Sequence, residues 1–113
     1  MDCIFCKIIA GEIPSKKVLE NDDVIAFHDI HPAAPVHVLV VPKIHVESIQ
    51  ALDAGTLPLL LPIHAAIREV AILSGISESG YRVIANCGAG AGQTVPHLHY
   101  HVLGGRVLGE KLL

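Results

Sequence analysis

Three histidines alternate with apolar residues in the segment Pro96-His97-Leu98-His99-Tyr100-His101-Val102-Leu103. Because successive side chains of a β-strand point to opposite faces, this alternation predicts a strand over 97–103. The three imidazoles then share one face of the strand, and the residues between them face the core. A sheet face without a chemical role would ordinarily carry Thr, Lys or Glu, so a row of imidazoles indicates a functional site.

The rest of the sequence predicts four more strands and two helices. Runs rich in β-branched and aliphatic residues, bounded by turn residues, place strands at 17–20, 24–28, 36–41 and 81–86, with Pro42 stopping the third. Apolar residues at helical spacing predict a long helix over 57–73 that ends before Gly75, and a short helix is expected over 5–10. Hairpin-length links join several strands, so the expected fold class is α+β: an antiparallel sheet with one long helix and a short N-terminal helix. Without repeats or linkers, residues 1–113 are expected to form a single domain.

Composition narrows the classes of function. The formal net charge is −3, and the one basic pair, Lys16-Lys17, is expected to be solvated surface, so no nucleic-acid partner is expected. The longest apolar stretch, 57–66, is interrupted by two prolines and a histidine and is much shorter than the roughly 20 residues of a membrane helix. The N-terminus lacks the pattern of a signal peptide, and three cysteines without such a signal argue against a disulfide framework. We therefore expect a cytoplasmic protein without membrane contact.

Two kinds of chemistry fit a row of three histidines. In the first, all three bind one metal ion, but His97 and His101 would lie about 13 Å apart along a regular strand. Zinc binds nitrogen at about 2.0–2.1 Å, so this spacing disfavours a single shared ion. In the second, each ring has its own task and the central His99 is a nucleophile, because a neutral imidazole attacks phosphorus at neutral pH. The spacing of the row favours the second chemistry.

A glycine-rich loop over 87–93 leads into the histidine segment. Glycine lets the backbone approach a ligand closely and point N–H groups at an anion, so the loop is expected to hold a phosphate. The loop lacks the Gly-Lys-Ser/Thr ending of a Walker motif, and a strand follows it instead of a helix. Cys87, at its start, is expected to be a packing residue.

Together these blocks resemble the histidine-triad (HIT) superfamily, in particular its small nucleotide-binding phosphoramidases, often called HinT. The segment 97–103 fits the family pattern of three histidines alternating with apolar residues at every position. The resemblance spans nearly the whole chain, in the family's order, through Ile4-Phe5-Cys6-Lys7-Ile8-Ile9, Glu12-Ile13-Pro14, Ala26-Phe27-His28-Asp29-Ile30, Ala34-Pro35-Val36-His37, Val41-Pro42-Lys43 and Gly92-Gln93-Thr94.

The resemblance implies a homodimer with a shared sheet, in which each subunit binds a nucleoside monophosphate. His99 is then the nucleophile, passing through a nucleotidyl-histidine intermediate, and His37 and His97 assist its orientation and proton balance. The phosphate end is implied to be held by His101, Thr94, Asn86 and the backbone of Gly92 and Gln93. The nucleoside is implied to be held by Asp29 at the ribose and by Phe5, Phe27 and Ile30 around the base. Thr94 stands where many members have serine, and it keeps the hydroxyl. Asp29 has a simpler alternative role as a turn residue after a strand.

Cys3 and Cys6 form a C-x-x-C pair, which by itself fits zinc, redox chemistry or buried thiols. Some HIT members carry both cysteines and complete a structural zinc site with two histidines, which correspond here to His45 and His97. A Cys2His2 set is closed and tetrahedral, so this zinc would be structural. Related proteins that lack the cysteines imply that zinc is not needed for the chemistry, and no organic cofactor is expected.

The function expected from this resemblance is hydrolysis of nucleoside phosphoramidates, with adenosine as the nucleoside. A neighbouring alternative is hydrolysis of dinucleoside polyphosphates or nucleotidyl transfer, although transferase members commonly have glutamine in place of the third histidine, here His101. A nucleotide-binding regulatory protein with little turnover and a zinc-stabilised scaffold are the alternatives from other classes.

Overall fold

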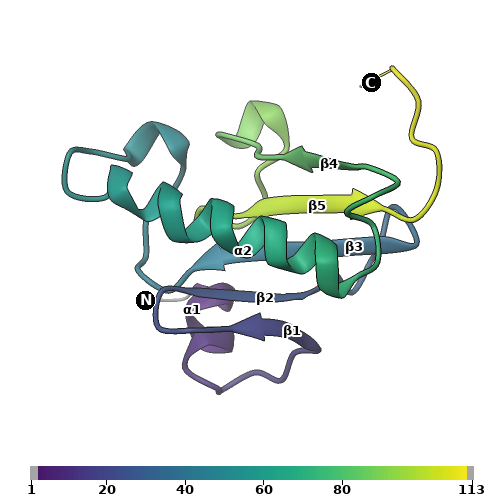
Figure 1. The fold of residues 1–113 in the computed structure, drawn as a ribbon. Coiled ribbons are helices and arrows are strands. Elements are labelled where there is room, and N and C mark those ends of the chain that lie inside the picture. The colour runs from purple at the N-terminus through teal and green to yellow at the C-terminus, as the bar shows by residue number, and fades with distance from the viewer. Residues whose placement is uncertain (1–2, 112–113) are drawn as a thin grey trace.

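The computed structural model describes residues 3–111, which form a five-stranded antiparallel sheet with helices on both faces (Figure 1). The sheet order is β1-β2-β3-β5-β4, and each neighbouring pair is antiparallel. This confirms the expected α+β class. The strands are β1 (Lys17–Glu20), β2 (Val24–His28), β3 (Val36–Pro42), β4 (Tyr81–Ile84) and β5 (Tyr100–Gly104).

The long helix α2 (Leu60–Leu73) crosses one face of the sheet, and the short helix α1 (Ile4–Ile9) lies on the other (Figure 1). Two apolar layers result, because alternate side chains of β2 and β3 point to opposite faces. Val24 and Ala26 pack in the cluster under α2, whereas Ile25 and Phe27 pack in the cluster that includes α1. The strands β2 and β3 are therefore buried on both faces. The short helix α1 covers less of its face than α2 does, so a polar site has room beside α1.

The expected helix over 57–73 is confirmed, with its first three residues, Leu57–Leu59, forming a 3-10 turn that continues into α2. The two prolines fall in these first turns, where a missing N–H costs no helical hydrogen bond. The buried stripe of α2 is Ile63, Ala66, Ile67, Val70 and Ala71. Among residues 3–111, no helix is long and apolar enough to cross a membrane.

The histidine segment differs from expectation in where its strand begins. β5 starts at Tyr100, not at residue 97, because the Leu98 N–H donates to the Val46 carbonyl and the His97 N–H to the Val95 carbonyl, outside the sheet. The alternation of faces nevertheless holds: Leu98, Tyr100 and Val102 all pack in the cluster under α2. The partner strand β4 also ends earlier than predicted, at Ile84 instead of residue 86. Ile84 pairs with His101, close to the start of β5, so little of β5 remains for later residues of β4 to pair with. Pro42 is the last residue of β3 and not the first beyond it.

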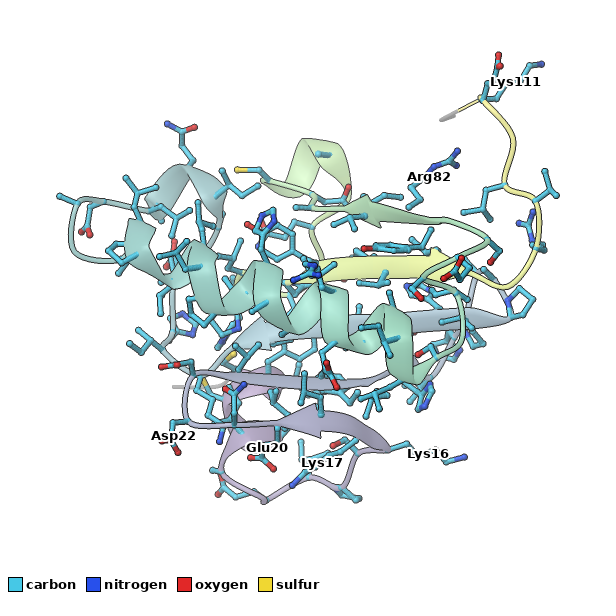
Figure 2. The ribbon with its side chains drawn as sticks, viewed as in Figure 1. Lys16, Lys17, Glu20, Asp22, Arg82 and Lys111 are labelled. Atoms are coloured by element: carbon cyan, nitrogen blue, oxygen red, sulfur yellow. The ribbon has the colours of Figure 1, made fainter. Side chains whose placement is uncertain are left out.

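The two edges of the sheet differ in character. Lys16, Lys17, Glu20 and Asp22 project outward at the β1 edge in Figure 2, and the Lys17 ammonium lies 2.8 Å from the Glu20 carboxylate. Both lysines are exposed, and Lys17 is paired at the surface as expected, whereas Lys16 also lines the pocket described below. At the opposite edge, the Arg82 guanidinium extends from β4 toward the C-terminal segment and donates to the Gly109 carbonyl.

Candidate active site and metal centre

A pocket of about 960 Å³ opens on the α1 face of the sheet. The chain segments that line it are α1, the residues just before β1, the end of β2 with the loop after it, β3, and the approach to β5. Its wall combines aliphatic and aromatic side chains with the imidazoles of His37, His99 and His101. An apolar pocket with a few convergent polar groups is the usual form of a small-molecule site.

His99 is held so that one particular ring nitrogen stays unprotonated. Its Nδ1 lies 2.7 Å from the His97 carbonyl oxygen, which can only accept, so Nδ1 carries a proton and, in the neutral ring, Nε2 has the lone pair. The ring is 6% exposed and meets Phe5 edge-on, with ring centroids 5.0 Å apart. His99 therefore lines the pocket in an orientation that places the lone pair of its neutral form on Nε2.

A chain of hydrogen bonds sets the protonation of the other two imidazoles. The Ala33 N–H donates to His37 Nδ1 at 3.0 Å, so the neutral His37 ring carries its proton on Nε2. That Nε2 lies 2.9 Å from His101 Nδ1 and donates to it. His101 then carries its own proton on Nε2, where it can be donated to an anion in the pocket. His37 and His101 are 64 residues apart in sequence, so this relation depends on the β3–β5 pairing.

Burial in the pocket keeps the rings of His37 and His101 neutral at pH 7. Burial, helped by the neighbouring His99 and His37 rings and opposed by the Asp29 carboxylate, lowers the pKa of His101 to about 4. Burial also lowers the pKa of His37, again opposed by Asp29. Desolvation disfavours the cationic form of an imidazole, so both rings act here as neutral hydrogen-bonding groups.

Asp29 is both a turn residue and a pocket residue. Its Oδ1 accepts the His31 N–H at 2.8 Å, as in an Asx turn, and its Oδ2 lies 3.4 Å from His37 Nε2. It lines the pocket together with Phe5, Phe27, Ile30 and Thr94, so the structure brings these five predicted residues together with the three imidazoles.

Three other predicted residues, Asn86, Gly92 and Gln93, do not line the pocket. The Gln93 side chain instead fastens the glycine-rich loop: it donates to the Glu47 and Val95 carbonyls and accepts the Gly88 N–H. This leaves Thr94 as the member of the loop segment that reaches the pocket wall. Cys87 is exposed, which corrects the expectation of a packing residue, because β4 ends before it and leaves it in a loop.

Sequence reasoning missed the segment before β1 as part of the pocket. Ile13, Pro14, Ser15 and Lys16 all line it. Ile13 and Pro14 belong to a block that carried the family resemblance but received no role in the site, since this segment reaches the pocket only through the path of the chain between α1 and β1. His28, at the end of β2, also lines the wall.

Cys3, Cys6, His45 and His97 meet in a second cluster next to the pocket, with one ligand atom from each within 4.8 Å of the others. The His97 ring is fully buried and donates through Nε2 to the Pro42 carbonyl at 2.8 Å, which leaves its Nδ1 as a lone pair. That Nδ1 lies 3.3 Å from Cys3 Sγ, 3.5 Å from Cys6 Sγ and 3.1 Å from His45 Nδ1.

These separations fit a tetrahedral metal ion. Zinc binds nitrogen at about 2.0–2.1 Å and sulfur at about 2.3 Å, so its tetrahedral ligands lie about 3.3–3.8 Å apart. The Cys6 Sγ to His45 Nδ1 distance is 3.3 Å, and all four ligand atoms lie within 4.8 Å of one another. His97 therefore belongs to this cluster and does not line the pocket beside His99.

Comparison with known proteins agrees with this fold. The model of the HIT domain matches residues 10–108. The purine nucleoside phosphoramidase of Escherichia coli is 42% identical over 111 residues, which cover 98% of this chain and 93% of that protein. A HIT family hydrolase from Clostridium thermocellum has a TM-score of 0.97 at 52% identity, covering 99% of this chain and 97% of that one. A histidine triad protein from Clostridium difficile has a TM-score of 0.94 at 50% identity, covering 98% and 96%.

The fold and the histidine pocket thus define a hydrolase built on a small antiparallel sheet. The chain belongs to the HIT family.

Proposed function

We propose that this protein binds a nucleoside 5′-monophosphate group and hydrolyses nucleoside phosphoramidates, with adenosine as the nucleoside. The observation that carries the proposal is the protonation pattern of the pocket. His99 presents an unprotonated Nε2, and His101 presents an Nε2–H, on the wall of one pocket. A nucleophile beside an anion-stabilising donor is what displacement at phosphorus requires.

In the first step, His99 Nε2 attacks the α-phosphorus and forms a P–N bond to the ring. The P–N bond to the leaving amine breaks, and the departing nitrogen takes the electron pair and a proton from solvent. The nucleotidyl-imidazolium formed in this way is cationic, and the His97 carbonyl that accepts its Nδ1–H stabilises the charge. In the second step, water attacks phosphorus and gives up a proton to solvent, the bond between phosphorus and Nε2 breaks with its electron pair returning to the ring, and the nucleoside monophosphate leaves neutral His99.

His101 serves in this scheme as a hydrogen-bond donor to a non-bridging phosphoryl oxygen. Its pKa of about 4 makes it neutral at pH 7, so it stabilises developing negative charge without first carrying a full positive charge. The His37 Nε2–H, held by the Ala33 N–H at the opposite nitrogen, keeps His101 in the required tautomer. This gives His37 a positioning role.

The nucleoside is proposed to lie along the apolar wall. Phe5, Phe27 and Ile30 would surround the base, and the 86% exposed Ile30 side chain offers apolar surface that a ligand would cover. Asp29 Oδ2 has no backbone donor and is the atom proposed to accept from the ribose hydroxyls. Thr94, by its hydroxyl, is proposed to contact the phosphate.

Asn86 and the backbone of Gly92 and Gln93 remain predicted phosphate contacts. Gly92 adopts a φ of +89°, a left-handed conformation that other residues rarely take, so the loop depends on glycine there. Because Gln93 ties this loop down, a small shift of the loop on ligand binding would have to break its side-chain hydrogen bonds.

The test is hydrolysis of adenosine 5′-phosphoramidate and of a diadenosine polyphosphate by the same preparation. We expect rapid turnover of the first and its loss in His99→Ala, with unchanged turnover in the matched control His64→Ala, whose side chain is exposed on α2. Preference for the diadenosine substrate would support the neighbouring alternative. Tight nucleotide binding without turnover would refute the enzyme and support the regulatory binding protein.

We also propose that the Cys3–Cys6–His45–His97 cluster holds a structural zinc ion. Four protein ligands at tetrahedral separations leave no open position for substrate, so the ion would support the fold and not the reaction. Elemental analysis of the purified protein should find about one zinc per chain, and much less in Cys3→Ser with Cys6→Ser. Equal zinc content in both proteins would refute the site.

A homodimer is proposed through the β4 edge. β4 is an outer strand of the sheet, and its Val83 and Ile84 are 41% and 37% exposed. The β1 edge, by contrast, carries the charged side chains that discourage strand pairing (Figure 2). Light scattering should give twice the chain mass, and Val83→Lys should shift it toward the monomer. A monomer at all concentrations would refute the pairing.

A further inference from the structure

We propose that the Cys3–Cys6–His45–His97 cluster positions the nucleophile, so that assembling its four ligands keeps His99 in the reactive tautomer and orientation. The connection runs through the main chain of His97 and the side chain of Phe5. The inference rests on the proposed role of His99 and on the four residues proposed to bind zinc.

The first connection is that His97 links the cluster, through its ring, to His99, through its main-chain carbonyl. Its ring, fully buried, uses Nε2 on the Pro42 carbonyl and presents Nδ1 to the cluster. Its carbonyl oxygen accepts the Nδ1–H of His99 at 2.7 Å. With both ring nitrogens engaged, the residue has little freedom to rotate, and so the carbonyl that selects the His99 tautomer is held in place.

The second connection is Phe5, which lies between the two cysteines on α1. Its ring packs edge-on against His99, at 5.0 Å between centroids and 84°, and against Phe27, at 5.6 Å and 71°. A six-residue helix is too short to be stable without tertiary contacts. Cys3 Sγ accepts the Cys6 N–H at 3.3 Å and so caps the helix, and joining both sulfurs to one centre would fix the helix that carries Phe5.

The same few atoms therefore control the orientation of His99 from two sides. A neutral imidazole can carry its proton on either nitrogen, and only the Nδ1–H form offers the Nε2 lone pair for attack. If the cluster opened, the His97 carbonyl and the Phe5 ring would both lose their support. A displacement of about 1 Å in a reacting group can cost about a hundredfold in rate, so even a modest loosening would be measurable.

The test variant is His45→Ala, which removes one ligand atom without altering a residue that lines the pocket. Its matched control is His64→Ala. Imidazole nitrogen chemical shifts, measured by NMR at pH 7.5, report which nitrogen of His99 is protonated and require no substrate. The zinc-loaded wild type should show the Nδ1–H form of His99.

We expect His45→Ala, and the wild type stripped with a chelator, to show a mixture of both His99 tautomers and a kcat lowered by about a hundredfold. His45→Cys with zinc restores four ligands of a known structural type and should recover both the single tautomer and the kcat. A general loss of stability would not be reversed by this change of ligand, so recovery separates positioning from folding.

An unchanged His99 tautomer in folded His45→Ala would overturn the inference. Should that variant fail to fold, failure of zinc-loaded His45→Cys to show the wild-type tautomer would overturn it equally. The proposed function fails on a different result, namely a zinc-loaded wild type that has the Nδ1–H form of His99 and does not hydrolyse the phosphoramidate.

Discussion

Acid should destabilise this protein through His101, and the structure indicates by how much. Burial lowers the pKa of the folded His101 to about 4, whereas an unfolded histidine has a pKa near 6.5. Between these values the unfolded chain binds more protons than the folded one, so the free energy of unfolding falls as the pH falls. Through this single group, the free energy of unfolding should fall by about 1 kcal/mol at pH 5.5 and by about 3 kcal/mol at pH 4.5, relative to pH 7.5.

The perturbation that isolates this effect is His101→Gln, which keeps a polar side chain but cannot take up a proton in this range. Because the chain has no Trp, unfolding by urea is best followed by far-UV circular dichroism at pH 7.5, 5.5 and 4.5. The variant should lose about 3 kcal/mol less than the wild type between pH 7.5 and 4.5. The exposed control His64→Gln should follow the wild type. Parallel pH profiles for wild type and His101→Gln would show that burial does not depress the His101 pKa and would refute this reasoning.

Three further predictions concern packing and the pocket. Ile63→Ala removes most of a fully buried side chain of α2 and should lower the free energy of unfolding in urea by about 2–5 kcal/mol. The control Val107→Ala, at a 91% exposed position, should have almost no effect. Equal losses in both variants would contradict the assigned core. Gly104→Ala would place a Cβ 2.9 Å from Ile76 Cδ1 and should lower the free energy of unfolding by about 1–3 kcal/mol. A melting temperature equal to that of the wild type would argue against this close contact. Thr94→Val keeps the shape of the side chain but removes the hydroxyl, and kcat/KM for adenosine 5′-phosphoramidate should fall by about tenfold to a hundredfold; unchanged kinetics would remove Thr94 from the phosphate site.

Local pattern was enough to predict the sheet, the long helix and the row of histidines, whereas the other predicted pocket residues came from the resemblance to the HIT superfamily. β1 and β2 have the predicted bounds, and the apolar spacing of 57–73 gave the correct buried stripe of α2. The alternation in 97–103 assigned the faces correctly even where the backbone is not a strand. These features follow from the order of side chains along a few turns or a few strand residues, where each residue's neighbours are known in advance.

The start of β5 is different, because it depends on a partner that lies far away in the chain. The Leu98 N–H donates to the Val46 carbonyl instead of to a neighbouring strand, and nothing in the sequence of residues 97–99 predicts this hydrogen bond. Asn86 and Gln93 were predicted at the phosphate by analogy of position, yet the path of the loop places Thr94 on the pocket wall and turns the Gln93 side chain to the backbone of Glu47.

The number and spacing of the histidines are properties of the chain, and they were sufficient to locate the chemistry. Which nitrogen of each ring carries a proton is a property of the folded molecule. His99 is set by the carbonyl of His97, and His101 by His37 from another strand, because the tautomer of an imidazole depends on the hydrogen-bond partner that meets it. Sequence order determined that three imidazoles would share one face, and only tertiary contacts gave them the different surroundings from which we propose one as a nucleophile, one as a donor and one as a metal ligand.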